Sequence, residues 1–453
     1  MREESPDREA ATLLRLSIPI VIAQVGQMML GVVDAAYAGH LSVHALDSVT
    51  LGNLWQLGSM MPLSGIIWGL GPLVSQAHGA GRGDEVGLAL QRALVLAGAL
   101  SVLVAIAWTY TAEVLTLLGQ DPALIETASE FVRTQRFAAP GFVLYAALST
   151  YLNSRGIVRP ATLTMLVANV FNALLGWALA FGKLGLPALG VRGVAISTGL
   201  TDLLLPTVLG LLIWRMKLYE GAWVPWSRQA LSRAAFALQL RLGVPNGITL
   251  ALEMWSFQLG TILAGRLGTL ALGAHAVTLS LASLSFMVPL GFSIGTSARI
   301  GQLIGAGRRE AAQHAAHTAL RLCAVYAVCA GGTFALARSL LPRLYSQDTA
   351  IVAAAAAVLP IAGAFQLFDA LQACGSGILR GMGKPRITAT FNLVGYFVFG
   401  IPLAYYLGLR TDLGLAGIWL GYAAGLGFVA TALVGTVLTR GPRTVKPLVE
   451  SRL

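Results

Sequence analysis

Long apolar runs follow one another along almost the whole chain, each separated from the next by a short polar or glycine-rich connection. The runs are about 20 residues long, the length of an α-helix that crosses a bilayer, whereas strands of membrane barrels span about 10 residues and alternate apolar with polar positions. We therefore expect an all-α integral membrane protein. The twelve predicted transmembrane helices cover residues 13–38, 48–74, 87–109, 125–152, 161–182, 190–216, 242–264, 275–300, 315–341, 351–378, 387–408 and 414–438.

The composition supports this prediction and excludes other classes of protein. Of the 453 residues, 56% are hydrophobic and 11% are charged, against about 25% charged in soluble proteins. The net charge of +11 comes from basic residues scattered singly through short connections, so we expect no nucleic-acid partner. The three cysteines lie within apolar runs, which gives neither a disulfide framework nor a metal-binding pair.

The distribution of lysine and arginine predicts the orientation in the membrane. An even number of spans places both termini on the same side, and the first run is read as a helix because no small-residue cleavage site of a signal peptide follows it. Connections on the side of the termini collect 22 of the 31 basic residues, and the opposite connections collect six: Lys183, Arg192, Arg266, Arg338, Arg343 and Arg410. Because cytoplasmic loops carry the excess of positive charge, we expect cytoplasmic termini in a bacterial-type inner membrane.

The two halves of the chain carry the same motifs 226 residues apart. The pairs are Pro19 and Pro245, Leu41 and Leu267, Gln76 and Gln302, and Gly79-Ala-Gly-Arg82 and Gly305-Ala-Gly-Arg308. This self-similarity indicates two homologous six-helix bundles, at 1–216 and 242–440, with a cytoplasmic linker at 217–241 and a tail at 441–453. Since each half holds an even number of spans, the halves are parallel repeats whose pseudo-twofold axis lies along the membrane normal, with a cavity between the bundles.

Four carboxylates fall deep inside predicted spans: Asp34, Asp202, Glu253 and Asp369. An acid at the centre of a membrane helix costs roughly 2.5 to 3.5 kcal/mol, so such residues usually face the protein interior and serve a function. Asp202 is the weaker candidate, because Thr198 and Pro206 lie one turn to either side and its carboxylate could simply bond a neighbouring helix.

The other three acids lie on polar stripes at helical spacing. The stripe of Glu253 holds Asn246, Thr249, Ser256 and Gly260, that of Asp34 holds Gln24, Gln27 and Tyr37, and that of Asp369 holds Phe365, Gln366, Gln372 and Ser376. A carboxylate in a dry site can bind and release a proton, whereas several carboxylate and amide oxygens can bind Na⁺ as a metal. The sequence does not separate these two ions, and Asn172 is equally well an oxygen ligand near Asp34 or an interhelical hydrogen-bond partner.

Aromatic residues in these helices, including Trp255, Phe286 and Phe365, are candidates for an adaptable surface that binds flat cations. Ordinary helix packing explains them equally well. Two motif matches carry no chemistry: the GxSxG pattern at 291–295 lies inside a predicted span, and the glycine-rich segment at 79–83 is duplicated, as expected of a turn between helices.

Taken together, several motifs resemble the multidrug and toxic compound extrusion (MATE) family, in particular its NorM-like branch. They are Pro19, Asp34-Ala-Ala-Tyr-Ala-Gly39, Ser75-Gln-Ala-His-Gly-Ala-Gly-Arg82, Phe181-Gly-Lys-Leu-Gly-Leu-Pro187, Glu253, Gln366-Leu-Phe-Asp369 and Leu379-Arg-Gly381. The resemblance implies no enzyme activity and no cofactor, but export of organic cations and hydrophobic drugs in exchange for Na⁺ or H⁺. It also implies a cation site at Glu253 and Asp369 and a second at Asp34.

The sequence departs from the family pattern at two positions that bear on these sites. Phe365 stands where relatives often have tyrosine, and Gly176 stands where they often have a second asparagine. A lipid-linked sugar flippase of the same superfamily is the first alternative, and an intramembrane enzyme or a channel is less favoured. We expect a monomer whose partners are drug-like cations and the bilayer.

Overall fold

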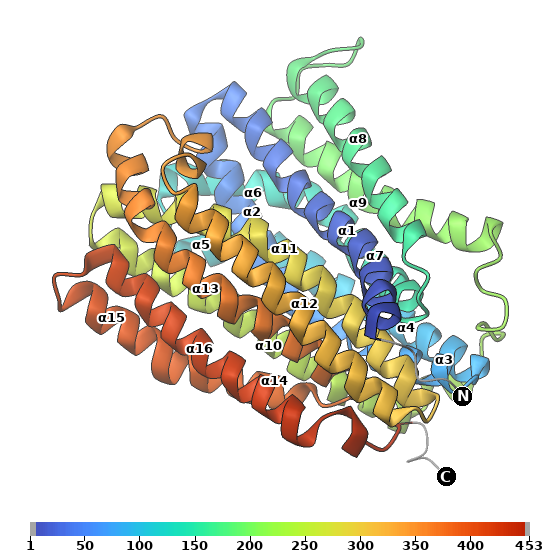
Figure 1. Ribbon diagram of the computed structural model, residues 1–453. Helices are drawn as coiled ribbons and strands as arrows, with labels where there is room; N and C mark the ends of the chain where they lie inside the picture. The colour runs from blue at the N-terminus through green and yellow to red at the C-terminus, as the bar shows by residue number, and fades with distance from the viewer. Residues whose placement is uncertain (1–5, 449–453) are drawn as a thin grey trace. The chain divides into compact units, whose positions relative to one another are not determined.

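The computed structural model describes residues 6–448, and its regular elements are all helical. Figure 1 shows them in chain order. They are α1 (Pro6–Leu41), α2 (Val43–Ile67), α3 (Leu70–Gly79), α4 (Gly83–Thr109), α5 (Thr111–Leu117), α6 (Pro122–Gln135), η1 (Arg136–Ala138), α7 (Ala139–Ser154), α8 (Arg159–Phe181), α9 (Val191–Arg215), η2 (Arg228–Leu231), α10 (Arg233–Arg266), α11 (Thr269–Gly305), α12 (Arg309–Leu336), η3 (Leu341–Leu344), α13 (Thr349–Gly381), α14 (Pro385–Asn392), the π-helix η4 (Leu393–Gly400), α15 (Ile401–Leu409), α16 (Gly414–Arg440) and η5 (Pro442–Thr444).

Eleven helices in the described part of the chain are long and apolar enough to cross a membrane, which confirms the predicted all-α membrane fold. The predicted fourth span, 125–152, is instead divided among α6, η1 and α7. Pro140 occupies the first turn of α7, where its missing N–H costs little, and it interrupts the continuous helix that hydropathy alone predicts. The last residues of the predicted linker at 217–241 are helical, because α10 begins at Arg233.

The described chain forms two compact units. The first holds residues up to Val21, Gly71–Gly81 and residues from Ile248 onward, and the second holds Ile22–Leu70 and Arg82–Gly247. The start of α1 therefore packs with C-terminal helices and the start of α10 with N-terminal helices. The chain passes from one unit to the other after Val21 and again after Gly247. These two residues are 226 positions apart, so both passages occur at the same position of the repeat.

Glycines at repeat-related positions let these helices approach backbone to backbone. In the second unit, a Cβ on Gly69, in the short connection between α2 and α3, would lie 2.5 Å from the nitrogen of Gly243 in α10. In the first unit, a Cβ on Gly295 of α11 would lie 2.5 Å from Oγ of Ser17 in α1. Position 69 corresponds to 295, and 243 corresponds to 17. The repeat found in the sequence is thus also a repeat of helix contacts, built on small residues as is usual within membranes.

The crossing of α3 and α11 is reciprocal. A Cβ on Gly79 would lie 2.0 Å from the carbonyl oxygen of Gln302, and a Cβ on Gly305 would lie 1.9 Å from that of Gln76. Gln76 is fully buried and donates through Nε2 to the carbonyl of Gly381 at 2.9 Å. The glycine-rich segments at 79–83 and 305–309 are turns between helices, as predicted.

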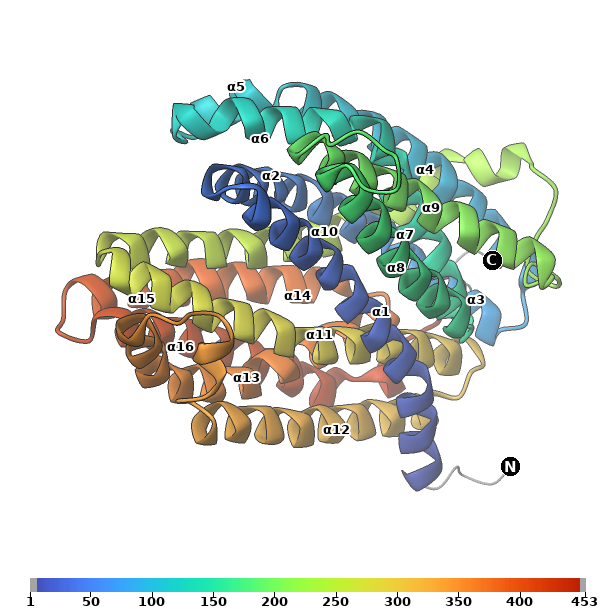
Figure 2. The same cartoon turned by 90° about the horizontal axis from the view of Figure 1, so that it is seen from above.

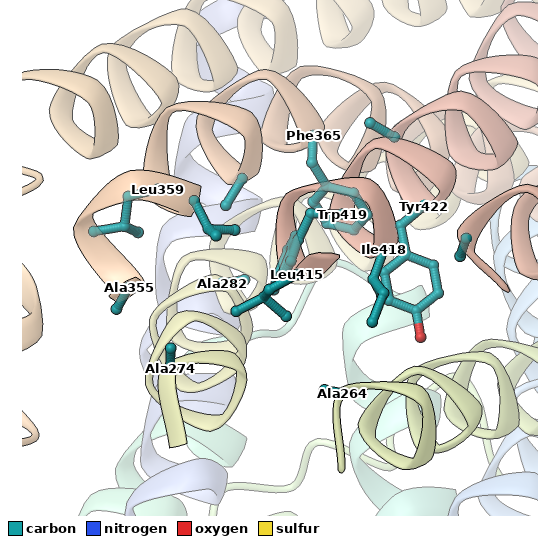
Figure 3. Close-up of a cluster of buried hydrophobic side chains, with 14 of the residues drawn as sticks. Ala264, Ala274, Ala282, Ala355, Leu359, Phe365, Leu415, Ile418, Trp419 and Tyr422 are labelled. Atoms are coloured by element: carbon teal, nitrogen blue, oxygen red, sulfur yellow. The ribbon is translucent and has the colours of Figure 1, made fainter. Parts of the chain in front are cut away.

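A cluster of large side chains from α13 and α16 forms a core of the first unit (Figure 3). The ring of Trp419 is fully buried and lies 5.7 Å from the ring of Phe365. Helices α10 and α11 contribute alanines to this cluster, among them Ala264, Ala274 and Ala282, together with a few larger residues such as Leu281. Large residues opposite small ones fill the space between helices at the density of a protein interior, and this core holds α13 rigidly beside the site described below.

A buried ion pair fixes the start of α1 to α11 within the first unit. The guanidinium of Arg299 donates from Nε to Oε1 of Glu9 at 2.8 Å and from Nη2 to Oε2 at 2.6 Å. Glu9 is 3% exposed. Such two-pronged geometry matches carboxylate to guanidinium, and removal of one partner leaves a buried charge without compensation.

We predict that Gly79→Val strongly destabilises the protein, by about 3 kcal/mol or more, because the backbone carbonyl of Gln302 cannot yield to the new side chain. Gly98→Val in α4 is the matched control, since a Cβ there meets no atom within 4 Å. Thermal unfolding of the detergent-solubilised protein measures both. Equal melting temperatures for the two variants would contradict the close crossing.

Glu9→Gln should lower the free energy of unfolding by about 3 to 5 kcal/mol, the usual effect of removing one partner of a buried ion pair. Glu85→Gln should lower the free energy of unfolding by less than about 1 kcal/mol, because Glu85 and Arg82 form a solvent-exposed ion pair at 3.4 Å. Denaturant unfolding followed by tryptophan fluorescence compares the variants. A Glu9→Gln protein as stable as the Glu85→Gln protein would show that the buried pair contributes nothing.

Candidate functional site

The carboxylate of Glu253 lies where three helices meet in the first unit. Gln372 of α13 donates from Nε2 to Oε1 of Glu253 at 2.6 Å, and Asn392 at the end of α14 donates from Nδ2 to the same oxygen at 2.8 Å. Among the described residues, no protein group donates to Oε2. The amide oxygen of Asn392 is buried and has no hydrogen-bond partner in the described chain. The carboxylate can therefore take up a proton, and Oε2 together with the amide oxygen of Asn392 can coordinate a cation.

Glu253 and Asp369 line one cavity of about 60 Å³. The remaining lining residues are mostly apolar: Phe257, Leu279, Ala282, Ser283, Phe286, Phe365 and Tyr396. A water molecule needs roughly 10 to 15 Å³ of such space, whereas drug-sized ligands occupy pockets of about 300 Å³ or more. This cavity suits a few waters or a partly hydrated ion and is too small for a drug.

Asp369 is buried and, among the described contacts, accepts no side-chain hydrogen bond. Phe365, one turn earlier on α13, is 1% exposed and packs edge-to-face on Phe257 at 6.1 Å. The carboxylate of Asp369 therefore lies beside the rings of Phe365 and Phe257, where an unpaired negative charge is costly. Tyr396 supplies a phenol to this lining from the π-helix η4, a type of helix turn often found at functional sites.

One basic residue lies near these acids. Arg380, which the sequence placed in the connection after the tenth span, is a buried residue of α13 that donates from Nη2 to Oγ of Ser293 at 2.7 Å. Its charge is within electrostatic range of Glu253. The guanidinium therefore offsets part of the negative charge of the site.

Asp34 forms a separate site in the second unit. The hydroxyl of Thr198 on α9 lies 2.8 Å from both oxygens of Asp34, and Asn172 of α8 donates from Nδ2 to that hydroxyl at 3.2 Å. The amide oxygen of Asn172 is buried without a partner in the described chain. Asp202 is buried one turn beyond Thr198 and within electrostatic range of Asp34. This site thus holds two acids and one amide oxygen that lacks a donor.

The departure at Gly176 has a steric explanation. The hydroxyl of Tyr37 donates to the carbonyl of Ala173 at 2.7 Å, and its ring packs edge-to-face on Phe181 at 5.9 Å. A Cβ on Gly176 would lie 2.9 Å from this ring. The tyrosine therefore fills the space that an asparagine at position 176 would need.

In the second half, an aromatic side chain occupies the space beside the position that corresponds to Asp34. The position that corresponds to Asp34 in the second half is Gly260, and a Cβ there would lie 1.5 Å from Oη of Tyr422. That hydroxyl donates to the carbonyl of Ser256 at 2.8 Å. An aspartate at position 260 would clash with this hydroxyl as it lies here, and the acids of the first unit stand at other positions, Glu253 and Asp369.

The structure does not bring every candidate residue to a site. Trp255 is 59% exposed and lies outside the cavity lining, and Ser256 is buried against Tyr422 through its backbone. Gln27 is half-buried, with no side-chain hydrogen bond among the described contacts. Gln366 accepts a hydrogen bond from Oγ of Ser285 at 2.9 Å and is not among the residues that line the cavity.

Three contributors were missed as site residues: Asn392, Tyr396 and the hydroxyl of Thr198. Asn392 had a detectable signal, because an asparagine inside the apolar run 387–408 is as unusual as Asn172 in the fifth span. Nothing in the sequence distinguished Tyr396 from an ordinary packing residue. Among the described residues, no three His, Cys, Asp or Glu side chains gather as a metal cluster, so a bound Na⁺ would need amide oxygens as well.

Acids on bilayer-crossing helices, two of which line an ion-sized cavity, are typical of a membrane transporter. The MatE family matches residues 19–178 and 245–406, two ranges that begin 226 residues apart. Multidrug and toxin extrusion protein 2 of Mus musculus is 32% identical over 94% of this chain and 74% of its own length, and protein 1 of Homo sapiens is 32% identical over 95% and 75%. The crystal structure of the eukaryotic MATE transporter AtDTX14 is 26% identical, with a TM-score of 0.90 over 97% of this chain and 99% of its own.

The chain therefore belongs to the multidrug and toxic compound extrusion family, whose members are transporters and not enzymes. The family prediction is confirmed, and assignment to the NorM-like branch stays a prediction. The similar structure of the Vibrio cholerae MATE transporter VcmN, with a TM-score of 0.83 at 19% identity, shows the same fold.

Thr198→Val removes the hydroxyl that donates to Asp34 and keeps the shape of the side chain. Because a hydrogen bond to a charged group contributes about 1.5 to 3 kcal/mol, we expect transport by the variant to fall about ten- to a hundredfold at limiting ion concentration. Thr201→Val is the matched control on the same helix, since its buried hydroxyl donates only to the carbonyl of Ser197 at 2.7 Å. Dye efflux from cells at equal expression compares the two. Equal efflux would remove Thr198 from the site.

Proposed function

We propose that this protein is a secondary active multidrug efflux antiporter, which exports organic cations and hydrophobic drugs in exchange for Na⁺ or H⁺ by alternating access. The observation that carries the proposal is repeated in both units. Each unit holds a carboxylate on a bilayer-crossing helix beside an asparagine whose amide oxygen has no donor in the described chain. These are the half-buried Glu253 with Asn392 and the buried Asp34 with Asn172. The names of the relatives, multidrug and toxin extrusion proteins, support the substrate class.

The acids supply the coupling in this proposal. A bound proton or Na⁺ neutralises Glu253 and Asp369 in their aromatic surroundings, and the gain in free energy favours one conformer over the other. A charge that moves inward across the membrane releases about 2.3 kcal/mol per 100 mV, which is sufficient to drive export against a concentration gradient of more than tenfold. In the second unit, Asp34 and Asp202 bind a proton or Na⁺ in the same way, since a shared proton or a bound cation stabilises two neighbouring carboxylates.

The ion site and the drug site are separate in this proposal, because a cavity of about 60 Å³ admits the ion alone. The exposed Trp255 and the half-buried Gln27 remain candidates for contact with the drug. The protein functions as a monomer in an inner, cytoplasmic membrane of bacterial type, with both termini in the cytoplasm. The excess of basic residues on the side of the termini supports this orientation.

Glu253→Gln and Asp369→Asn should each abolish drug resistance, because neither amide can bind a proton or a cation as the acid does. Glu310→Gln is the control, since Glu310 is an exposed acid in the first turn of α12. Growth in the presence of a toxic dye, at equal amounts of protein in the membrane, measures the effect. Normal resistance in both site variants would overturn the coupling assignment.

Proteoliposomes identify the ion and the substrate class. Efflux of a fluorescent cation is measured with an imposed Na⁺ gradient or an imposed pH gradient, each alone. The gradient that drives efflux in the native protein and fails to do so in Glu253→Gln is the coupling gradient. Movement of a lipid-linked sugar, with no movement of the dye under either gradient, would instead identify a flippase.

A further inference from the structure

The connection between α9 and α10 is held in place by side chains of the second unit. Gln91 of α4 donates from Nε2 to the carbonyl of Val224 at 2.7 Å and accepts from the backbone nitrogen of Ser227 at 3.5 Å. Tyr151 of α7 donates to the carbonyl of Ala222 at 3.1 Å. Gln91 and Tyr151 are both fully buried. These hydrogen bonds therefore hold the backbone of this connection in place, although most of the connection is not helical.

Further contacts bring the same segment against the start of α4, where Figure 2 shows it in yellow-green. A Cβ on Gly83 would lie 1.9 Å from the carbonyl oxygen of Gly221, and a Cβ on Gly87 would lie 2.9 Å from the nitrogen of Val224. Arg155 of α7 donates to the hydroxyl of Tyr151 at 2.8 Å and also to the carbonyl of Leu218. A flexible linker between two bundles would need none of these contacts.

This fixed segment holds large aromatic side chains in solvent-accessible positions. Trp223 is 38% exposed and Trp226 is 60% exposed, and their rings meet edge-to-face at 6.1 Å. Trp214, at the end of α9, is 65% exposed. Exposing such apolar area to water is unfavourable, whereas tryptophan is enriched at the boundary between lipid headgroups and hydrocarbon, which suits its apolar ring and polar N–H.

Basic residues flank the tryptophans. Arg215, Arg228 and Arg233 are exposed and form no ion pair among the described residues. Lys217 is also exposed and pairs with Glu220, the single acid between positions 214 and 233, at 3.6 Å. The surface therefore combines a net positive charge with amphipathic rings, which is complementary to an anionic bilayer surface.

We propose that residues 214–233 bind the anionic headgroups of phospholipids, with the tryptophan rings in the headgroup layer and the arginines on the phosphates. The predicted cytoplasmic location places this segment beside the leaflet where a positively charged surface is expected. Binding there anchors the start of α4 and the start of α10 to the membrane surface. This interaction needs neither the coupling ion nor the drug, so it can be tested without transport.

The test uses the full-length protein with Cys323, Cys329 and Cys374 replaced by serine and the exposed Gln229 replaced by cysteine. An environment-sensitive fluorophore on position 229 is followed in nanodiscs of phosphatidylcholine with increasing phosphatidylglycerol. We expect a blue shift that grows with the phosphatidylglycerol fraction and weakens at high salt. Arg228→Gln with Arg233→Gln should lower the affinity for the anionic lipid about 25-fold, from roughly fivefold per residue.

Arg338→Gln with Arg343→Gln is the matched control, because both arginines belong to the connections predicted on the opposite side. This pair should leave the shift unchanged, and Trp226→Ala should reduce its size. Thermal unfolding shows whether each variant is folded. A fluorophore signal that is equal in both lipids, or that is unchanged by the Arg228 and Arg233 substitutions in a folded protein, would overturn the proposal, as would saturation of the signal by inorganic phosphate alone.

Discussion

A bilayer offers no water to the backbone, so each N–H and C=O group inside it must find its partner within the chain. This constraint makes the described chain helical, and it also shapes how the helices meet. Because lipid tails are as apolar as leucine, burying leucine between helices gains little, and close backbone approach becomes important. The reciprocal contacts of Gly79 with Gln302 and of Gly305 with Gln76 are of this kind.

The same constraint explains why polar groups are so informative in this protein. An acid that must leave water is retained only where the surrounding groups compensate it. Glu253 meets two amide donors and the charge of Arg380, and Asp34 meets a hydroxyl that is itself bonded by an amide. Each site remains incomplete, since one amide oxygen near each acid lacks a donor in the described chain. An incomplete polar site is suited to an ion that comes and goes.

Duplication explains the scaffold but not the sites. The 226-residue repeat accounts for the start of α1 packing with C-terminal helices and the start of α10 packing with N-terminal helices. It also accounts for the paired glycine contacts. The chemistry does not follow it, because Tyr422 occupies the space that an acid at position 260 would need. The two units therefore share a framework of helices but carry unlike polar sites.

The sequence by itself determined the all-α membrane fold, the family, the repeat and the positions of the buried acids, because hydropathy, motif spacing and the cost of intramembrane charge are local or periodic properties. It did not determine which polar residues serve each acid. Asn392 lies 139 residues from Glu253, and Thr198 lies 164 residues from Asp34, so only packing brings them together. The break at Pro140, the burial of Arg380 and the exposure of Trp255 were likewise decided by neighbouring helices, because the face that a residue presents to lipid or to protein depends on what packs against its helix.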